Sequence, residues 1–138
     1  MMEDFYEINI RQYGDERGKL TTIEGLNDIP FEIKRVYYIS NVGLDKDRAH
    51  HAHKNSKRVL SAIQGSCKAP LFDGPIQKDF ILDSMTKGVY FNKAVWCELS
   101  EFKDNAIVLA LADEVYDEAD YIRSYEEYIK FLDKQKEI

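Results

Sequence analysis

All three histidines of the chain lie within the stretch RAHHAHKNSKR, residues 48–58. Imidazole can accept and return a proton near neutral pH, and it is also the commonest metal ligand in proteins. On an extended segment successive side chains point to opposite faces, so His51 and His53 share one face and His50 points the other way. The stretch therefore predicts either a metal site or a proton-transfer site built on His51 and His53.

The metal interpretation depends on the residues that follow the pair. Two histidines separated by one residue are the pattern with which cupin β-barrels hold a metal, followed by a glutamate and a glycine. Here the glycine is present, but Arg58 occupies the glutamate position. A guanidinium repels the cation that a carboxylate would bind, and no histidine follows His53. Cys97 with Glu98 is a conceivable substitute, but adjacent strand residues face opposite ways. We therefore expect neither a metal nor another cofactor.

Without a metal, two histidines on one face suit proton transfer at a carbon beside a carbonyl. That chemistry needs a base and a group that stabilises the enolate-like oxygen, which nearby arginines and tyrosines can supply. Two other interpretations stay open. The histidines can simply bond to loop backbone at a polar strand end, or the stretch can form a basic patch with Arg48, Lys54, Lys57 and Arg58. The acidic net charge of −6 disfavours the basic patch.

Composition restricts the class of protein. A chain of 138 residues with 44% hydrophobic and 32% charged residues suits one globular domain. The net charge disfavours nucleic acid as a partner, and no apolar run is long enough to cross a membrane. The first residues do not resemble a signal peptide, and Cys67 and Cys97 lack the CxxC spacing, so we expect reduced thiols and a cytoplasmic protein.

A series of short strand-like segments, followed by one helix, must position the histidines. Alternating or apolar runs bounded by Gly, Asp and Asn predict an all-β sandwich or barrel. Ile122, Tyr125, Ile129 and Leu132 recur at helical spacing, which predicts a C-terminal amphipathic helix. The expected strands cover 5–10, 19–25, 30–42, 57–65, 66–74, 80–84, 88–92, 96–102 and 106–114, and the expected helix covers 120–138.

Several motifs together resemble one known family. They are ERGKL, IPFEIKRVYYI, RAHHAHK, a Gly-Ser turn followed by FDG, AVW, and YDEADYIRSY. In this combination the chain is similar to the sugar 3,4-ketoisomerases of the cupin superfamily, which act on dTDP-4-keto-6-deoxyglucose on the way to 3-amino sugars. The resemblance covers nearly the whole chain. It implies a single domain over residues 1–138 with a cupin, or jelly-roll, β-barrel, and a homodimer with an exchanged N-terminal strand.

The resemblance also implies a reaction and roles for particular residues. The carbonyl moves from C4 to C3 of the hexose through an enediol-like intermediate, which requires no redox cofactor. His51 matches the catalytic base, and His53 matches a histidine that supports it. Tyr37 matches a tyrosine of the sugar pocket, and strand alternation allows only one of Tyr37 and Tyr38 to point inwards.

Arginines match family positions near the substrate, where guanidinium groups suit a diphosphate. They are Arg35, Arg48 and Arg123, and Lys54 is a fourth contact of the same kind. Members of the family have glycine where Ala49 stands, and alanine is tolerable there unless φ is positive.

Two positions are associated with the configuration that the family sets at C4. Arg17 matches the pattern for a galacto-type product. Cys97 matches neither that pattern nor the gluco-type pattern. The two positions therefore disagree about the product, and they favour a galacto-type or mixed configuration.

Three alternatives remain from the sequence. A non-catalytic cupin that senses a nucleotide sugar would keep the arginines without needing a base. A metal-dependent isomerase or dioxygenase would need the missing ligands. An epimerase of nucleotide sugars would leave the carbonyl at C4.

Overall fold

Two long strands, β6 (Arg58–Phe72) and β9 (Trp96–Ala112), run antiparallel along each other and organise the whole fold. The computed structural model describes residues 4–43 and 45–136. The other strands are β1 (Phe5–Asn9), β2 (Arg11–Asp15), β3 (Gly18–Thr22), β4 (Arg35–Ile39), β5 (Arg48–His53), β7 (Gln77–Leu82), β8 (Lys87–Phe91) and β10 (Tyr121–Ile122). A 3₁₀ turn, η1 (Glu118–Asp120), and one helix, α1 (Tyr125–Lys136), complete the described chain.

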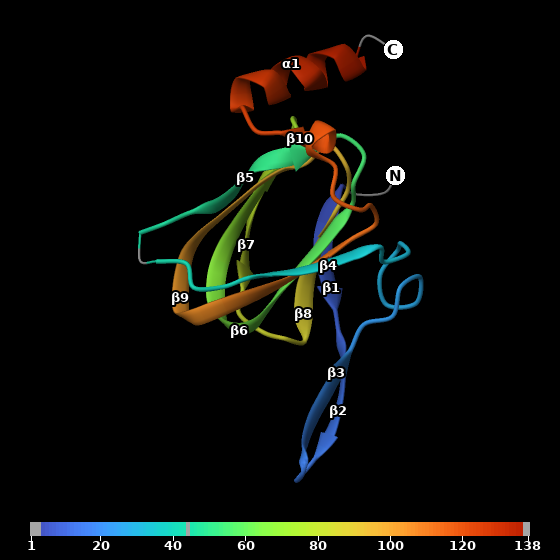
Figure 1. Cartoon of the computed structure of the whole chain (residues 1–138), viewed down its shortest axis with the longest axis vertical. Coiled ribbons are helices and arrows are strands. Elements are labelled where there is room, and N and C mark those ends of the chain that lie inside the picture. The colour runs from blue at the N-terminus through green and yellow to red at the C-terminus, as the bar shows by residue number, and fades with distance from the viewer. Residues whose placement is uncertain (1–3, 44, 137–138) are drawn as a thin grey trace.

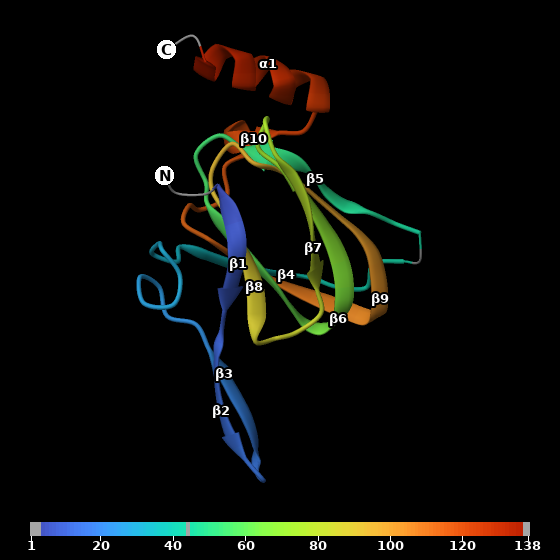
Figure 2. The ribbon, with the colours of Figure 1, turned by 180° about the vertical axis from the view of Figure 1, so that it is seen from behind.

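Eight strands form one sheet in the order β1-β8-β6-β9-β5-β10, with β7 attached to β6 and β4 attached to β9. The ribbon curves round so that β1 and β8 lie across the barrel from β5 and β9, and α1 lies beyond one end (Figures 1 and 2). The prediction of an all-β barrel with a C-terminal helix is therefore confirmed.

The barrel interior is apolar because strand alternation sends one set of side chains inwards. On β6, Cys67, Ala69 and Leu71 are buried, whereas the residues between them remain partly exposed. Other positions of β6 and the strands β1, β7, β8 and β9 supply most of the rest of this core. Its buried members include Phe5, Leu60, Phe80, Val89, Phe91, Cys97, Leu99, Val108 and Ala110.

The prediction of a turn at Gly65-Ser66 was wrong. The register of β6 against β9 shifts between Ala62 and Lys68, so a bulged region bends the strand instead of ending it. Gly65 takes φ of 66°, and a Cβ there would lie 2.4 Å from the carbonyl oxygen of Lys103. The close approach of β9 therefore requires a glycine. The predicted strands 96–102 and 106–114 are likewise one bent strand.

Two other boundaries differ from the sequence predictions. The expected strand over 30–42 is reduced to β4, because a loop occupies residues before Arg35. Residues 11–15, which lie outside the expected strands, form β2, which pairs with β3 around Glu16 and Arg17. This β2–β3 hairpin extends away from the barrel (Figures 1 and 2).

The helix begins later than predicted, at Tyr125 instead of residue 120, and the predicted residues 137–138 lie outside the described ranges. The backbone N–H of Tyr128 donates to the carbonyl of Ser124, and the N–H of Glu127 lies 3.3 Å from the Ser124 hydroxyl, so Ser124 caps the N-terminus. Ile122 lies on β10 instead, paired with Ala52 of β5. The buried Tyr128 packs with Trp96 and Ile122, which holds α1 against the end of the barrel. Arg123 consequently lies on the segment between β10 and the helix.

Candidate active site

A bulge in β5 determines which histidines face the barrel. The register against β9 shifts between Ala49 and His51, and both Ala49 and His50 adopt positive φ, at 72° and 51°. The side chain of His50 is 46% exposed and lies near Asp47 on the outer face. The rings of His51 and His53 meet edge to face with their centroids 4.8 Å apart. The predicted pairing of these two histidines is therefore present, while Ala49 occupies a position that favours glycine.

His51 is arranged as a neutral base. Its Nδ1 lies 2.9 Å from the carbonyl oxygen of Ala49, which can only accept, so Nδ1 carries the proton and donates. Among the described residues no hydrogen bond reaches Nε2. Burial, together with the positive charges of Arg123 and Arg58, lowers the pKa of His51 to about 4. At neutral pH the ring is therefore uncharged and has a free lone pair on Nε2.

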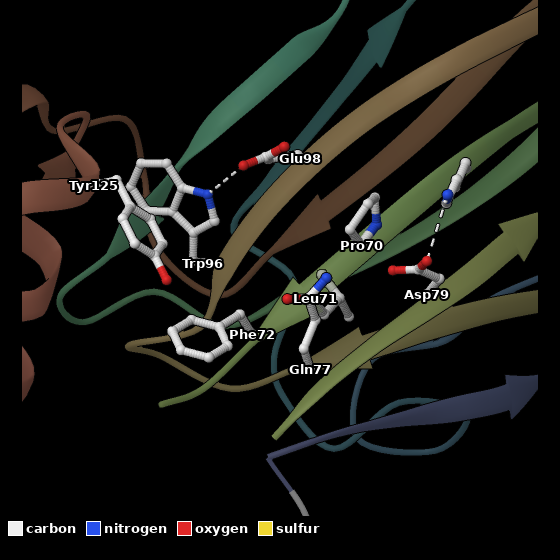
Figure 3. Close-up of a pocket in the computed structure, with 9 residues that line it drawn as sticks. Pro70, Leu71, Phe72, Gln77, Asp79, Trp96, Glu98 and Tyr125 are labelled. Atoms are coloured by element: carbon white, nitrogen blue, oxygen red, sulfur yellow. Dashed lines mark hydrogen bonds and ion pairs between the residues drawn. The ribbon is translucent and has the colours of Figure 1, made fainter. Parts of the chain in front are cut away.

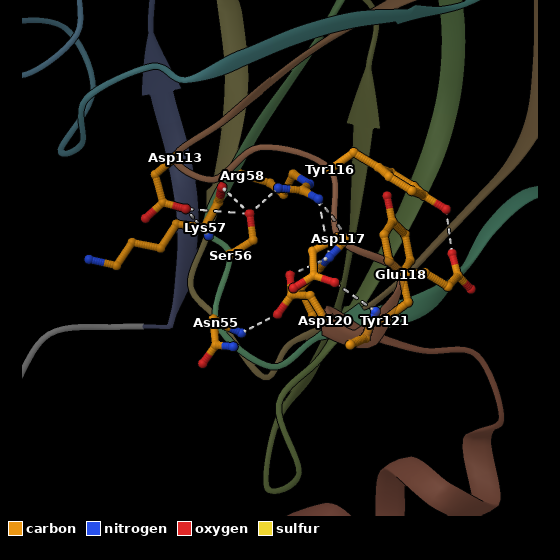
Figure 4. Close-up of polar contacts among 12 residues, drawn as sticks. Asn55, Ser56, Lys57, Arg58, Asp113, Tyr116, Asp117, Glu118, Asp120 and Tyr121 are labelled. Atoms are coloured by element: carbon orange, nitrogen blue, oxygen red, sulfur yellow. Dashed lines mark hydrogen bonds and ion pairs between the residues drawn. The ribbon is translucent and has the colours of Figure 1, made fainter.

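His53 lies deeper and has more partners. Its Nδ1 is 3.1 Å from Oδ2 of Asp120, and Nη2 of Arg58 lies 3.0 Å from its Nε2. Burial, and then the charge of Arg58, lowers the pKa of His53 to about 2. The ring is therefore neutral, and its contact with Asp120 is a hydrogen bond rather than an ion pair. Figure 4 shows the buried Arg58 and Asp120 within the polar contacts that surround this position.

Tyr37 and Arg35 reach the site from β4. Tyr37 packs against the barrel core, whereas Tyr38 is 65% exposed, so the inward tyrosine is the one that was predicted. Burial raises the pKa of the Tyr37 phenol. The guanidinium of Arg35 lies 4.4 Å from the centre of the Tyr37 ring, and its Nη1 donates to the hydroxyl of Tyr121 over 3.2 Å.

Arg123 reaches the same cluster through Tyr121. The Tyr121 ring lies 5.0 Å from the His51 ring and 4.3 Å from the His53 ring. The guanidinium of Arg123 stacks 4.3 Å from the centre of Tyr121 and donates two hydrogen bonds of 2.9 Å to Glu118. The site therefore combines two neutral histidines with several fixed positive charges.

Cys97 lies directly opposite His51 in the pairing of β5 with β9. It is buried, and burial raises the pKa of its thiol. Its neighbours Trp96 and Glu98 point to the other face of the strand, where the indole donates to the Glu98 carboxylate over 2.9 Å. That outer face holds the cleft of about 180 Å³ that Figure 3 shows. Strand alternation separates this cleft from the histidines, so we do not place the reaction in it.

Three predicted substrate contacts lie outside the cluster in the single chain. Arg17 is at the tip of the β2–β3 hairpin, where its side chain is 87% exposed and pairs with Asp15. Arg48 is exposed at the first residue of β5. Lys54 follows the other end of β5 and lines a groove with Tyr121 and four residues of α1 that include Lys130 and Lys134.

Sequence reasoning missed three residues of the cluster, namely Arg58, Asp120 and Tyr121. Arg58 was noticed only because it is unfavourable for a metal. Its Nε is the only buried side-chain nitrogen or oxygen without a hydrogen bond in the described ranges. Asp120 and Tyr121 belong to the motif YDEADYIRSY, but their roles depend on pairing with β5, more than 60 residues earlier.

Residues 4–43 and 45–136 contain no group of three or more His, Cys, Asp or Glu side chains arranged to hold a metal. No helix in these ranges is long and apolar enough to cross a membrane.

Comparison with known proteins identifies the family. The model of the FdtA family (WxcM-like, C-terminal) matches residues 3–133. A TDP-4-oxo-6-deoxy-alpha-D-glucose-3,4-oxoisomerase from Aneurinibacillus thermoaerophilus is 42% identical over 127 residues, which cover 92% of this chain and 91% of the relative. The sugar 3,4-ketoisomerase QdtA from Thermoanaerobacterium thermosaccharolyticum, solved with TDP, superposes with a TM-score of 0.92 at 41% identity over 98% of both chains. NovW of Streptomyces spheroides, a 4-keto-6-deoxy sugar epimerase, shares only the fold, with a TM-score of 0.73 at 18% identity over 86% of this chain and 68% of that one.

The fold and the paired inward histidines define a cupin-type barrel. The chain belongs to the FdtA family, and its predicted resemblance to the sugar 3,4-ketoisomerases is confirmed.

Proposed function

We propose that this chain is an isomerase that converts TDP-4-keto-6-deoxyglucose into the 3-keto isomer. Relatives that cover nearly the whole chain at about 40% identity have this activity in their names, and QdtA carrying a histidine-to-asparagine substitution has been solved with TDP-4-keto-6-deoxyglucose. The observation that carries the proposal is the neutral His51 ring, whose Nδ1 is held by Ala49 while Nε2 remains available. We treat residues 1–138 as one such domain.

In the proposed reaction His51 removes the proton from C3 of the sugar through Nε2. The electrons of the broken C–H bond form a C3–C4 double bond, and the former C4 carbonyl oxygen takes up the negative charge. After proton exchange between the two oxygens, C4 receives a proton and C3 becomes the carbonyl carbon. Atoms and electrons balance without an oxidant or a reductant.

The reaction also requires stabilisation of the enediolate while it exists, and positive charge can provide this stabilisation. The proposed groups are the guanidinium of Arg35 and the phenol of Tyr37, which lie 4.4 Å apart from group to ring centre. We propose that Arg123 binds the diphosphate, and that Arg48 and Lys54, at opposite ends of β5, contact different parts of the substrate.

The charge distribution supports a reaction without a metal. Arg58 places a guanidinium nitrogen 3.0 Å from Nε2 of His53. A divalent cation bound to the histidine pair would have to displace this buried positive charge.

A proton NMR time course in deuterium oxide tests the function. With the chelator-treated protein we expect deuterium at the sugar carbons and growth of a 3-keto species. The variant His51→Asn should lower the rate by about 100-fold or more, which is the usual range for loss of a general base. His50→Asn is the matched control, since His50 faces outwards and asparagine tolerates its positive φ. Substrate binding without exchange or isomerisation would instead support the sensor alternative.

We further propose that the enzyme is a cytoplasmic homodimer that supplies a keto sugar to an aminotransferase for 3-amino sugar synthesis. An apolar groove of about 410 Å³ on the outer face supports the dimer; its lining includes Ile23, Ile33, Val36 and Leu109. Strand β1 pairs with β8 of its own chain, so the segment available for exchange is the β2–β3 hairpin. A partner's hairpin would then bring Arg17 to the site.

Mixing two variants tests this exchange if Arg17→Ala, like His51→Asn, proves inactive by itself. If Arg17 acts across the dimer, a mixed dimer of His51→Asn and Arg17→Ala subunits has one complete site. After subunit exchange we expect roughly a quarter of normal activity to return. Cys97 is proposed to influence the C4 configuration beside His51, and the C4 coupling pattern of the trapped product reports that configuration.

A further inference from the structure

Asp120 is a buried carboxylate that has no assigned role in the proposed reaction. It belongs to η1, and its backbone carbonyl accepts a hydrogen bond of 2.9 Å from the N–H of Lys54. Its Oδ1 accepts from the backbone N–H of Asn55 over 2.7 Å. Both contacts fix Asp120 against the end of β5, and Figure 4 shows the carboxylate beside Asn55. Its Oδ2 lies 3.1 Å from Nδ1 of His53.

The partners of His53 determine where its proton lies. An ionised carboxylate only accepts hydrogen bonds, so Nδ1 of His53 must donate to Asp120. A neutral imidazole then has a single lone pair, on Nε2. Arginine only donates, and Nη2 of Arg58 lies at nearly equal distances from the two nitrogens, 3.0 Å from Nε2 and 3.1 Å from Nδ1. The contact with Asp120 therefore sets the tautomer, and it leaves Nε2 as the acceptor for Arg58. Nη1 of Arg58 donates to the hydroxyl of Ser56, which anchors the guanidinium.

The two histidines therefore differ in availability. His53 has a partner on each ring nitrogen, and its side chain is only 3% exposed. His51 uses only Nδ1, on the carbonyl of Ala49, and is less buried. The charged and titratable groups that face His53 are Asp120 from η1, Arg58 from β6, Arg35 from β4, His51 from its own strand, Tyr121 from β10, and Arg123.

We propose that Asp120 is a positioning residue which, with Arg58, fixes His53 as the neutral tautomer with its proton on Nδ1 and leaves His51 as the only base of the pair. This inference rests on the proposed isomerase function, because only that reaction requires a base. His53 then acts through its position: it supports the edge of the His51 ring and keeps Arg58 beside the site.

The substitution Asp120→Asn tests this role. Asparagine keeps the size of the side chain but replaces one acceptor oxygen with an N–H₂ donor, so it cannot serve both Asn55 and His53 as the carboxylate does. We expect the fixed tautomer of His53 to be lost and kcat to fall by about 10- to 100-fold, the usual effect of removing the partner of a functional histidine. KM should change by less than about 3-fold, because the Asp120 carboxylate is buried and its oxygens bond to Asn55 and His53 rather than to the substrate.

The matched control is Asp117→Asn in the same turn. Asp117 accepts from the N–H of Ala119 and caps η1, and its side chain does not bond to a histidine. It should leave the His53 tautomer and kcat unchanged. An equal fall of kcat in both variants would show that Asp120 acts only by holding the turn together, and this would overturn the proposal.

Nitrogen-15 NMR of the histidine rings supplies a readout that needs neither activity nor the variants. In the unaltered protein we expect Nδ1 of His53 to be protonated, Nε2 to be unprotonated, and neither signal to change between pH 5 and pH 8. A His53 that titrates near neutral pH, or that carries its proton on Nε2, would overturn the proposal even if Asp120→Asn failed to fold. If the unaltered protein does not isomerise the sugar, the proposed function fails, while the tautomer of His53 remains measurable.

Discussion

Mild acid should destabilise this protein through its two inward histidines. Burial lowers the pKa of His51 to about 4 and that of His53 to about 2, whereas a histidine in an unfolded chain titrates near 6.5. As the pH falls below that value, the unfolded chain binds protons that the folded protein does not bind. The stabilisation is therefore fully present above the unfolded pKa and is lost as the pH falls toward the folded values.

The expected loss follows from the linkage between proton binding and folding. Between pH 7 and pH 5 each of these histidines should cost about 2 kcal/mol, so the pair should cost about 4 kcal/mol. This is a large part of the roughly 5–15 kcal/mol by which domains are stable. The ion-paired carboxylates titrate mainly outside the range from pH 7 to pH 5. Arg11 lowers the pKa of Asp28 to about 2, and Arg123 lowers that of Glu118 to about 2. Those carboxylates contribute stability above their unfolded values near pH 4, and that part is lost mainly below pH 5.

Urea unfolding followed by circular dichroism at pH 7 and pH 5 measures the effect. The unaltered protein should lose about 4 kcal/mol of unfolding free energy between the two pH values, with little change in the denaturant slope. In His51→Asn and in His53→Gln, the pH-dependent loss should fall to about 2 kcal/mol, whatever the absolute stability of each variant. A loss below about 1 kcal/mol in the unaltered protein would refute the conclusion that both rings are held neutral.

Two further predictions concern the backbone, and the same urea unfolding experiment at pH 7 tests both. Gly65→Ala should cost about 2–4 kcal/mol, because the new Cβ would lie 2.4 Å from the carbonyl oxygen of Lys103 at a positive φ; an unchanged midpoint would contradict the close approach of β9. Ala49→Gly should stabilise by about 0.5 kcal/mol, since relief of the strain at φ of 72° exceeds the added flexibility of the unfolded chain. Ala52→Gly, at a fully buried position of the same strand, should instead cost about 1–2 kcal/mol, and destabilisation of both variants by equal amounts would argue against the bulge.

Local patterns were sufficient to predict the fold class but not the lengths of its strands. Alternation of apolar and polar residues identifies a strand, and the inward row Cys67, Ala69 and Leu71 follows it. Glycine also signals a turn when a segment is considered alone, which is why β6 was divided at Gly65. Its positive φ serves a bulge that exists only because β9 packs there, and no local pattern contains that partner. The helix start was misplaced for a related reason, since Ile122 fits helical spacing but is taken by pairing with Ala52.

For the candidate site, too, local patterns were sufficient for part of the prediction, and contacts between distant segments were not predicted. Strand alternation alone placed His51 and His53 on one face, and the resemblance selected Tyr37 over the exposed Tyr38. The bulge at Ala49 was not predicted, although alanine at a family glycine was its signal. Contacts made across the sheet and from the C-terminal segment, above all those of Asp120, required the structure.

The positive charges around the histidines have a consequence for the chemistry. An imidazole with a pKa of about 4 is available in its basic form throughout the neutral range, but it is a weaker base than an ordinary histidine. If His51 removes a proton from carbon, as proposed, the reaction depends on lowering the pKa of the substrate C–H group more than on the strength of the base. The guanidinium of Arg35, which faces the same cluster beside Tyr37, is the group proposed to stabilise the enediolate oxygen. Arg58 thus accounts for two features of this barrel at once: it opposes the binding of a metal cation to the histidine pair, and it contributes fixed positive charge of the kind that a metal would otherwise supply.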